Sequence, residues 1–275
     1  MFFGKDDLVR DLGTLGVRSG DGVFVHTSLG QIGRVIGGPR ALIEALLDVV
    51  GPDGLIGMPG FSTDAYDPVD LMTPPPEIDE TRRAVIRAHV LGFDPQRSDV
   101  RDNGTVPETF RSWPGVVRSP HPTSSVLLLG AGAAEIAGTH DASGWATGPG
   151  TPWDRLRARP EMKILLIGVG WNRCSALHAA ESIATHRRLK MRVFKSGAGD
   201  APWVRAPDVA DDLDRLFPLV GEAWEKAKGV QFGHIGNARC RLTDYAALVD
   251  FASAWIDRRN AADGVPAFDP DMIEP

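Results

Sequence analysis

The chain has few of the features that would assign a protein to a class at once. Its 275 residues include only two cysteines, Cys174 and Cys240, which are far apart and form no CxxC pair. This excludes a zinc ribbon and a disulfide framework, and is typical of free thiols in a reducing compartment. No stretch approaches the roughly 20 apolar residues of a membrane-spanning helix, and the N-terminus lacks the apolar core of a signal peptide. We therefore expect a cytoplasmic protein with no membrane partner.

Positive charge is also in short supply. The 30 lysines and arginines are outnumbered by 36 acidic residues, so the formal net charge is −6. Basic residues are dispersed apart from the short run HRRLK at 186–190. Because binding to a phosphate backbone needs clustered cations, nucleic acid is not an expected partner.

What the sequence does contain is the rhythm of an α/β protein. Short β-rich runs alternate with longer segments of helical period. Four of these runs are expected to form strands, at residues 22–28, 54–61, 124–130 and 163–170. With 43% hydrophobic residues the chain can bury a sizeable core, as one large domain or as a main domain with a smaller appendage. We take residues 1–275 as a single domain.

Helices are expected in three places outside the motif discussed below. Apolar residues of ALIEALLDVV recur at helical spacing over 41–50, between glycines and a GPDG turn. Two further helices are expected within 211–227 and 243–260, with Thr243 as the N-cap of the second. By contrast, residues 62–103 are rich in proline and acidic residues. A loop of this length is usually functional, so we expect a loop-rich, substrate-facing insertion there.

The stretch HTSLGQIGRVIGGPR, residues 26–40, leads from an expected strand through a glycine-bearing loop into a helix. Glycines permit close backbone approach, and amides at a helix N-terminus favour an anion such as a pyrophosphate. The stretch has neither the P-loop pattern nor a clean GxGxxG. A tight turn without any ligand is therefore the alternative interpretation.

A second polar stretch, RSPHPTSS at 118–125, enters the third expected strand. Arg118, Ser119 and the paired serines could hold a phosphate or pantetheine amides, and His121 is kept extended by the prolines beside it. Capping and turn hydrogen bonds would explain the same residues equally well.

The most informative stretch is CSALHAAES, residues 174–182, which follows the fourth expected strand. A helix from Ser175 through residue 186 would place His178 and Glu181 on nearly one stripe. This helix begins just past the carboxyl end of a strand, where open α/β sheets bind ligands. A neutral imidazole suits proton abstraction near neutral pH, with a carboxylate to fix its tautomer. His178 is therefore the candidate general base.

Three other interpretations of this stretch stay open. The two side chains could be a structural pair on a partly exposed helix face. A zinc site has less support, because HxxE lacks the HExxH spacing and no third ligand follows, so no metal is expected. Cys174 and His178 could also form a nucleophilic dyad at i, i+4, although no oxyanion motif accompanies them.

Two acidic groups flank the candidate site, one in the loop-rich segment and one before an expected helix. A polycationic ligand would need several such carboxylates. Acidic residues at a helix start are also commonplace, because they suit its positive end. The members of the two groups are Asp64, Asp67, Asp70, Asp208, Asp211, Asp212 and Asp214.

Five blocks of the sequence, taken together, resemble the aminoglycoside 3-N-acetyltransferase family, also called the antibiotic acetyltransferases. Their order and spacing match from about residue 5 to residue 258. The blocks are VFVHTSLGQIGRVIGGPRALIEALLDVVGPDGLIGMP, GTVPETFRSWPGVVRSPHPTSSVLLLGAGA, GPGTPWDRL, KILLIGVG with ALHAAE, and GHIGNARCRLTD.

The resemblance implies an α/β fold with a central mixed sheet flanked by helices, distinct from the GNAT acetyltransferases. It also implies acetyl transfer from acetyl-CoA, as co-substrate, to the 3-amine of aminoglycoside antibiotics, and hence antibiotic resistance. His178 falls where the family has its catalytic histidine, with Glu181 beside it. The implied cofactor-side residues are Thr27, Ser28, Gly33, Arg34, Val35, Ile36, Gly37, Arg118, Ser119 and His121. The implied contacts to ammonium groups of the antibiotic are Asp64, Asp67, Asp208, Asp211 and Asp212.

Two departures from the family pattern concern the substrate rather than the chemistry. The middle loop is longer than we expect for the family, and Arg173 lies near the candidate site. The alternatives are therefore an acetyl-CoA-dependent N-acetyltransferase for another small amine, a hydrolase that uses Cys174 or Ser28, and a protein that binds a cation without turning it over. The sequence leaves the oligomeric state open.

Overall fold

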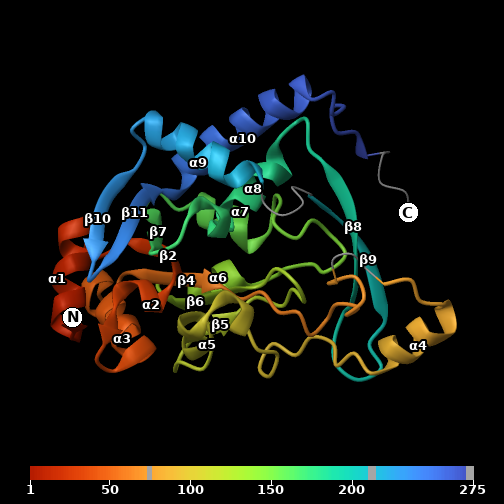
Figure 1. Cartoon of the computed structure of the whole chain (residues 1–275), viewed down its shortest axis with the longest axis horizontal. Coiled ribbons are helices and arrows are strands. Elements are labelled where there is room, and N and C mark those ends of the chain that lie inside the picture. The colour runs from red at the N-terminus through yellow and green to blue at the C-terminus, as the bar shows by residue number, and fades with distance from the viewer. Residues whose placement is uncertain (73–75, 210–214, 271–275) are drawn as a thin grey trace.

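The computed structural model describes residues 1–72, 76–209 and 215–270, with a seven-stranded sheet at its centre (Figure 1). In spatial order its strands are β10, β11, β7, β2, β4, β6 and β5. β2 is parallel to β4 and β7, whereas the other neighbouring pairs are antiparallel. The expected mixed sheet is thus confirmed. The strands are β2 (Gly22–Thr27), β4 (Leu55–Pro59), β5 (Val117–Arg118), β6 (Val126–Gly130), β7 (Met162–Ile167), β10 (Gln231–Ile235) and β11 (Ala238–Asp244).

Helices cover both faces of this sheet, which is why its central strands read as nearly continuous apolar runs. In β2, Val23 and Val25 point into one core and Phe24 into the other, as the period of two requires. On the Val23 side lie α1 (Lys5–Leu15), α3 (Gly38–Val50) and α5 (Thr105–Arg111). On the Phe24 side lie α6 (Ala133–Ala137), α7 (Pro152–Arg157), α8 (Ala176–Ile183), α9 (Leu216–Lys226) and α10 (Tyr245–Ala262).

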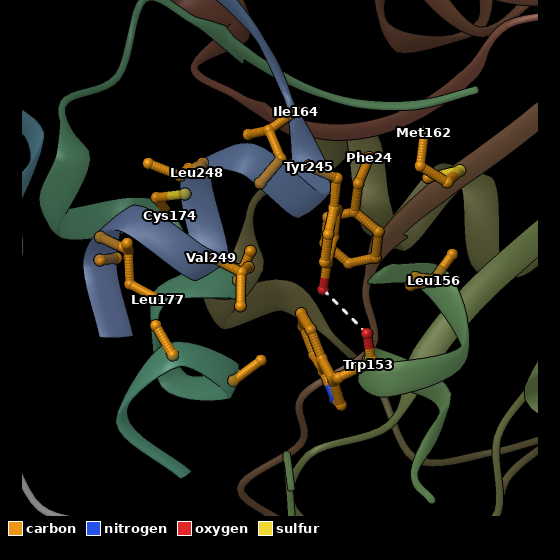
Figure 2. Packing of buried hydrophobic residues seen from close by; sticks show 14 of the residues in the cluster. Phe24, Trp153, Leu156, Met162, Ile164, Cys174, Leu177, Tyr245, Leu248 and Val249 are labelled. Atoms are coloured by element: carbon orange, nitrogen blue, oxygen red, sulfur yellow. Dashed lines mark hydrogen bonds between the residues drawn. The ribbon is translucent and has the colours of Figure 1, made fainter. Parts of the chain in front are cut away.

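The core on the α8 side is built around large aromatic residues (Figure 2). Phe24 and Trp153 lie 5.1 Å apart between ring centroids. The hydroxyl of Tyr245 donates to the carbonyl of Trp153 at 3.3 Å, so this buried polar group has a partner. Cys174 and Leu177 pack into the same cluster. The orientation of α8 is therefore set by packing against the sheet.

A second, antiparallel hairpin pairs β8 (Leu189–Lys195) with β9 (Trp203–Val209) outside the main sheet. The segment 62–103 packs against it, through a β-bridge from Tyr66 to Phe194 among other contacts. We call this hairpin together with the described part of 62–103 the arm. It contains α4 (Glu80–Ala88), which lies beside the far end of the hairpin and has no buried residue (Figure 1).

The elements expected from the sequence are largely present. All four expected strands form, as β2, β4, β6 and β7. The helix expected over 41–50 begins earlier, at Gly38, and the helix that carries His178 ends at Ile183 rather than near residue 186. The described part of 211–227 contains α9.

The N-cap of α10 requires a correction. Asp244 takes this position, and its carboxylate accepts the N–H of Ala247 at 2.7 Å. Thr243, the expected cap, lies in β11, and its hydroxyl donates to the carbonyl of Gly229 at 2.7 Å. The strand therefore runs one residue further than the sequence pattern indicated.

The C-terminal part is also more regular than expected. Besides its helices it forms β9 and the antiparallel pair of β10 and β11, joined by a tight turn at Gly236, where φ is +56°. Glycine suits this left-handed turn conformation. None of the helices in the described ranges is both long and apolar enough to cross a membrane.

Candidate active site

A cleft of about 1280 Å³ opens at the carboxyl ends of the parallel strands. It is lined by residues 26–30 at and after the end of β2, by Pro59 and Phe61 at and after the end of β4, and by 168–170 after β7. The arm supplies the opposite wall, with residues such as Tyr66 and 190–193. This is the position at which open α/β sheets bind ligands.

His178 and Glu181 form a hydrogen-bonded pair at this cleft. The distance from His178 Nδ1 to Glu181 Oε2 is 2.9 Å, and Glu181 is buried beneath the histidine, which lines the cleft. The carboxylate accepts a hydrogen bond from Nδ1–H, which places the lone pair of the neutral ring on Nε2. The ring also packs edge-on against Phe217, with 4.8 Å between centroids. Helix α8 therefore holds the imidazole of His178 in a fixed orientation at the cleft.

Only the beginning of the expected cofactor loop reaches the cleft. Thr27 and Ser28 line it, and the hydroxyl oxygen of Thr27 is enclosed without a hydrogen-bond partner in the described ranges. The next residues form α2 (Leu29–Ile32) and then β3 (Arg34–Val35), which pairs with β1 (Phe2–Phe3).

The rest of that loop belongs to other elements. Gly33, Arg34, Val35, Ile36 and Gly37 do not belong to the residues that line the cleft. Gly37 is instead the N-cap of α3, with a left-handed φ of +86°, which fits a glycine in a tight turn. The continuous loop predicted between strand and helix is thus interrupted by two short elements.

The second polar stretch mostly serves the interior. The guanidinium of Arg118 donates to Ser125 Oγ and to the carbonyls of Gly60 and Ser98, and burial lowers its pKa to about 10. Ser119 is fully buried and hydrogen-bonded to His140 Nδ1 at 3.0 Å. Neither Arg118 nor Ser119 lines the cleft. Their side chains bond to groups of the protein, whereas the prediction assigned them to a cofactor.

His121 has a structural place in the same stretch. Its Nδ1 accepts the backbone N–H groups of Thr123 and Ser124, at 3.2 and 3.1 Å. Burial lowers its pKa to about 2, and the ring packs against His140 and Phe194 rather than lining the cleft. Thr123 and Ser124 do line the cleft, so this turn presents hydroxyl groups there.

The acidic wall is also different from the prediction. Asp67 is fully buried and held by Arg83 and Arg87, at 2.8 and 2.7 Å, so its carboxylate does not face the cleft. Asp64 is likewise not a lining residue. Asp208 does line the cleft, but its carboxylate is paired with Arg192. The predicted Asp211, Asp212 and Asp214 lie outside the described residues.

Charges of both signs therefore line the described cleft. The acidic side chains are Asp70, Asp102 and Asp208, and the basic ones are Arg173, Lys190 and Arg192. Asp70 pairs with Arg83. The carboxylate of Asp102 accepts a hydrogen bond from Thr63 at 3.1 Å and has no cationic partner in the described ranges.

Asp102 and His26 are among the lining residues that the sequence analysis did not single out. Asp102 stands in the RDNG turn, at η1 (Arg101–Asn103), outside both acidic groups considered there. His26 lies inside the HTS stretch, and the alternation of β2 could have revealed that it points toward the α8 side.

The alternative of a cysteine nucleophile conflicts with the structure. Cys174 follows η2 (Trp171–Arg173), is fully buried, and does not line the cleft. Burial raises its pKa to about 12, which disfavours the thiolate that a nucleophile requires. No group of three histidine, cysteine, aspartate or glutamate side chains in the described part of the chain could hold a metal ion.

Comparison with known proteins gives consistent results. A family model described as aminoglycoside 3-N-acetyltransferase matches residues 24–257. Among curated proteins, the chain is 33% identical over 257 residues to the SPbeta prophage-derived aminoglycoside N(3')-acetyltransferase-like protein YokD of Bacillus subtilis (strain 168), covering 91% of each chain.

Solved structures share the fold. The structure of AAC-IIIb in a binary complex with CoASH matches with a TM-score of 0.82 and 29% identity, over 98% of this chain and all of the other. The structure of AAC-VIa bound to sisomicin matches with a TM-score of 0.81 and 32% identity, over 94% of this chain and 99% of the other.

Proposed function

Since the chain belongs to the aminoglycoside 3-N-acetyltransferase family, a family of acyltransferases with acetyl-CoA as co-substrate, we propose that it acetylates the 3-amine of an aminoglycoside and so confers resistance. The observation that carries this proposal is the His178 and Glu181 pair at the strand-end cleft. A solved relative bound to CoASH supports acetyl-CoA as the acetyl donor, and a solved relative bound to sisomicin supports an aminoglycoside as the acceptor.

His178 acts as the general base in this proposal. The amine, as its free base, attacks the thioester carbonyl carbon, which forms the C–N bond while His178 accepts one N–H proton. The C–S bond then breaks, and the sulfur leaves with the proton returned by His178 as CoASH. The products are the amide and the free thiol, with no net proton change from the free amine. General-base help of this kind contributes about 10²- to 10⁴-fold to the rate.

Glu181 holds the imidazole in place and stabilises its protonated form. Its carboxylate lies 2.9 Å from Nδ1 and is buried, so the interaction is shielded from water. The hydroxyl groups of Thr27, Ser28, Thr123 and Ser124 line the same cleft, where they are candidates to contact the thioester and the pantetheine chain.

We propose two carboxylates as contacts for ammonium groups of the substrate. Asp102 is accessible in the cleft, and Asp208 becomes available when a substrate ammonium competes with Arg192. The predicted contacts at Asp211 and Asp212 stay proposals. The basic side chains at the cleft support a second candidate, an acetyl-CoA-dependent N-acetyltransferase for a small amine that also carries an anionic group.

Three further expectations stay proposals of the same kind. We propose that residues 1–275 act as a single domain and that 62–103 is its substrate-facing insertion, because Tyr66 and Asp102 from that segment line the cleft. We also propose a cytoplasmic location, where acetyl-CoA is available.

Thiol release from acetyl-CoA, measured across a panel of aminoglycosides and simple amines, tests the function. We expect turnover with at least one gentamicin-, kanamycin- or apramycin-like scaffold. Turnover only with a small amino acid or aminophosphonate would support the second candidate instead.

A matched pair of histidine variants tests the mechanism. His178→Gln should lower kcat by about 10²-fold or more, because it removes the base. His186→Gln is the control, since His186 also bonds a carboxylate, Asp257 at 3.0 Å, but does not line the cleft. A His178→Gln enzyme with near-normal kcat would refute the assigned role.

A further inference from the structure

A second imidazole lies at the same cleft as His178. His26 is the next-to-last residue of β2 and lines the cleft, although only 4% of its surface is exposed. It lies on the Phe24 side of the sheet, with 5.4 Å between the two ring centroids. This is the side that α8 covers, so His26 faces the layer that carries His178.

One nitrogen of this ring lacks a hydrogen-bond partner in the described ranges. Its Nε2 atom is enclosed and meets no hydrogen-bond partner in the described ranges of the chain. A buried polar atom without a partner costs roughly 1–3 kcal/mol, so such atoms are rare unless a ligand supplies the partner. The ring borders the cleft, so a group bound there is the candidate for the partner that the described protein does not supply.

His26 also has a single charge state. Burial, together with the nearby His178, lowers its pKa to about 3. The ring is therefore neutral wherever an amine can be acetylated, and a neutral imidazole carries one N–H donor. It does not compete with His178 for the amine proton, so it suits hydrogen bonding rather than proton transfer.

We propose that His26 donates a hydrogen bond to the carbonyl oxygen of the acetyl thioester and stabilises the oxyanion that forms there. The attacking nitrogen, poised on His178, must lie about 3–3.5 Å from the carbonyl carbon, and the proposal turns the carbonyl oxygen toward His26, the other imidazole that lines the cleft. As the C–N bond forms, the carbonyl π electrons move to this oxygen and the hydrogen bond strengthens. They return when the C–S bond breaks, and His26 keeps its proton throughout.

This inference rests on the proposed acetyl transfer and adds a residue to it. It also explains why a strand end should keep an unpartnered histidine. A donor that is used only in the transition state has no hydrogen-bond partner in the protein without substrate. The protein without substrate is therefore less stable than it would be with a paired or apolar side chain at this position.

The decisive variant is His26→Leu, which keeps the side-chain size and removes both ring nitrogens. We expect kcat to fall about 10²-fold, with KM for the amine within about threefold, as for the loss of one oxyanion donor. His26→Gln, which retains an N–H donor, should recover about tenfold of that loss.

Stability separates this role from a structural one. Replacing an unpartnered buried imidazole with leucine should leave the melting temperature unchanged or raise it, because the desolvated nitrogen is gone. A structural histidine predicts the opposite, a lower melting temperature with kcat reduced in both variants alike. That pattern, or a His26→Leu enzyme with kcat within threefold of the unaltered protein, would overturn the inference.

A binding measurement gives a test that does not need turnover. The probes are a ketone analogue of acetyl-CoA, in which a methylene replaces the sulfur, and S-ethyl-CoA, which has no carbonyl. The unaltered protein should prefer the ketone by about fivefold, and His26→Leu should abolish this preference. An unchanged preference in the variant would also overturn the inference; if His26→Leu fails to fold, His26→Gln should keep the preference and His26→Ala should lose it.

The two proposals fail in distinguishable ways. If no amine releases thiol from acetyl-CoA with the unaltered protein, the proposed function fails, while the analogue preference still reports on His26. If thiol is released but neither kcat nor the preference depends on His26, the function stands and the role of His26 is wrong.

Discussion

The two walls of the cleft are held in different ways. The sheet wall, with α8 behind it, is fixed by apolar packing, as shown by the buried cluster around Phe24, Trp153 and Tyr245 (Figure 2). The arm wall has only a small apolar cluster and depends on buried ion pairs, such as Asp67 with Arg83 and Arg87. Packed side chains hold a position within narrow limits, whereas ion pairs depend on solvent, salt and partner.

This difference matches the proposed division of labour. Catalysis needs an imidazole held at a fixed place, and His178 stands on the packed wall. Substrate selection needs charges, and the arm supplies Asp102, Lys190 and Arg192. Changes to the packed wall should therefore affect kcat, and changes to the arm should affect KM and stability.

The largest expected effect comes from the packed wall. Glu181→Gln should lower kcat by about 10³-fold with little change in KM, because the charged form of His178 loses its buried counterion and the tautomer is no longer fixed. Steady-state kinetics with a good aminoglycoside measure this. Asp257→Asn, which changes the equivalent partner of His186 outside the cleft, is the control and should leave kcat unchanged. Equal losses in both variants would show that the pair at the cleft has no special role.

Breaking the central ion pair of the arm should have the next largest effect. Asp67→Asn leaves two arginines without their buried counterion and should lower the free energy of unfolding by about 3 kcal/mol. Urea denaturation measures the loss, and kcat should change less than KM. Asp70→Asn removes only the exposed partner of Arg83 and should cost under about 1 kcal/mol. A larger loss from Asp70→Asn than from Asp67→Asn would contradict this account of the arm.

Acid should destabilise the protein before its carboxylates are protonated. Burial lowers the pKa of His26 to about 3, of His121 to about 2 and of His140 to about 4. Each is neutral when folded but takes up a proton near pH 6.5 when unfolded, so stability is full above pH 6.5 and falls as the pH decreases. The slope is about 1.4 kcal/mol per pH unit for each histidine.

The urea midpoint between pH 7.5 and pH 5 measures this effect, in a window above the range of the carboxylates. His26→Leu removes one of the three groups, so its slope below pH 6 should be smaller by about 1.4 kcal/mol per pH unit. A slope equal to that of the unaltered protein would mean that His26 is not held neutral.

The smallest effect is expected at Asp102 on the arm side. Asp102→Asn should raise KM for a polycationic aminoglycoside by about threefold, since an accessible ion pair contributes only about 0–1 kcal/mol. The change should be larger at low salt and should not alter kcat. Asp53→Asn, in an exposed turn away from the cleft, is the control. A KM that does not respond to Asp102→Asn at any salt concentration would remove this residue from the substrate site.

The contrast between the walls also explains which predictions succeeded. The strands and helices of the packed wall carry strong apolar periodicity, so all four expected strands and the helix of His178 could be read from the sequence. The hairpin of β8 and β9 is more polar and mostly half-exposed, so its pattern is weak. The same limit hid α4, which buries nothing.

The candidate site followed the same rule. His178 and Glu181 are three residues apart on one helix, so local geometry alone brings them together. Whether an aspartate faces the cleft is not local. Asp67 and Asp102 are both acids of the loop-rich segment, yet one is enclosed by arginines 16 and 20 residues away and the other lines the cleft.

The sequence by itself determined the α/β class through its periodicity, and the histidine with its carboxylate through their spacing within one helix. It determined the family through the order of five blocks that resemble that family. Only the tertiary structure decided which polar groups reach the cleft. It engaged Arg118 in hydrogen bonds within the protein, buried Ser119 and Asp67, and brought His26 to the cleft. The physical reason is that the free energy of a buried polar group depends on the partners that folding brings to it, and those partners come from distant parts of the chain.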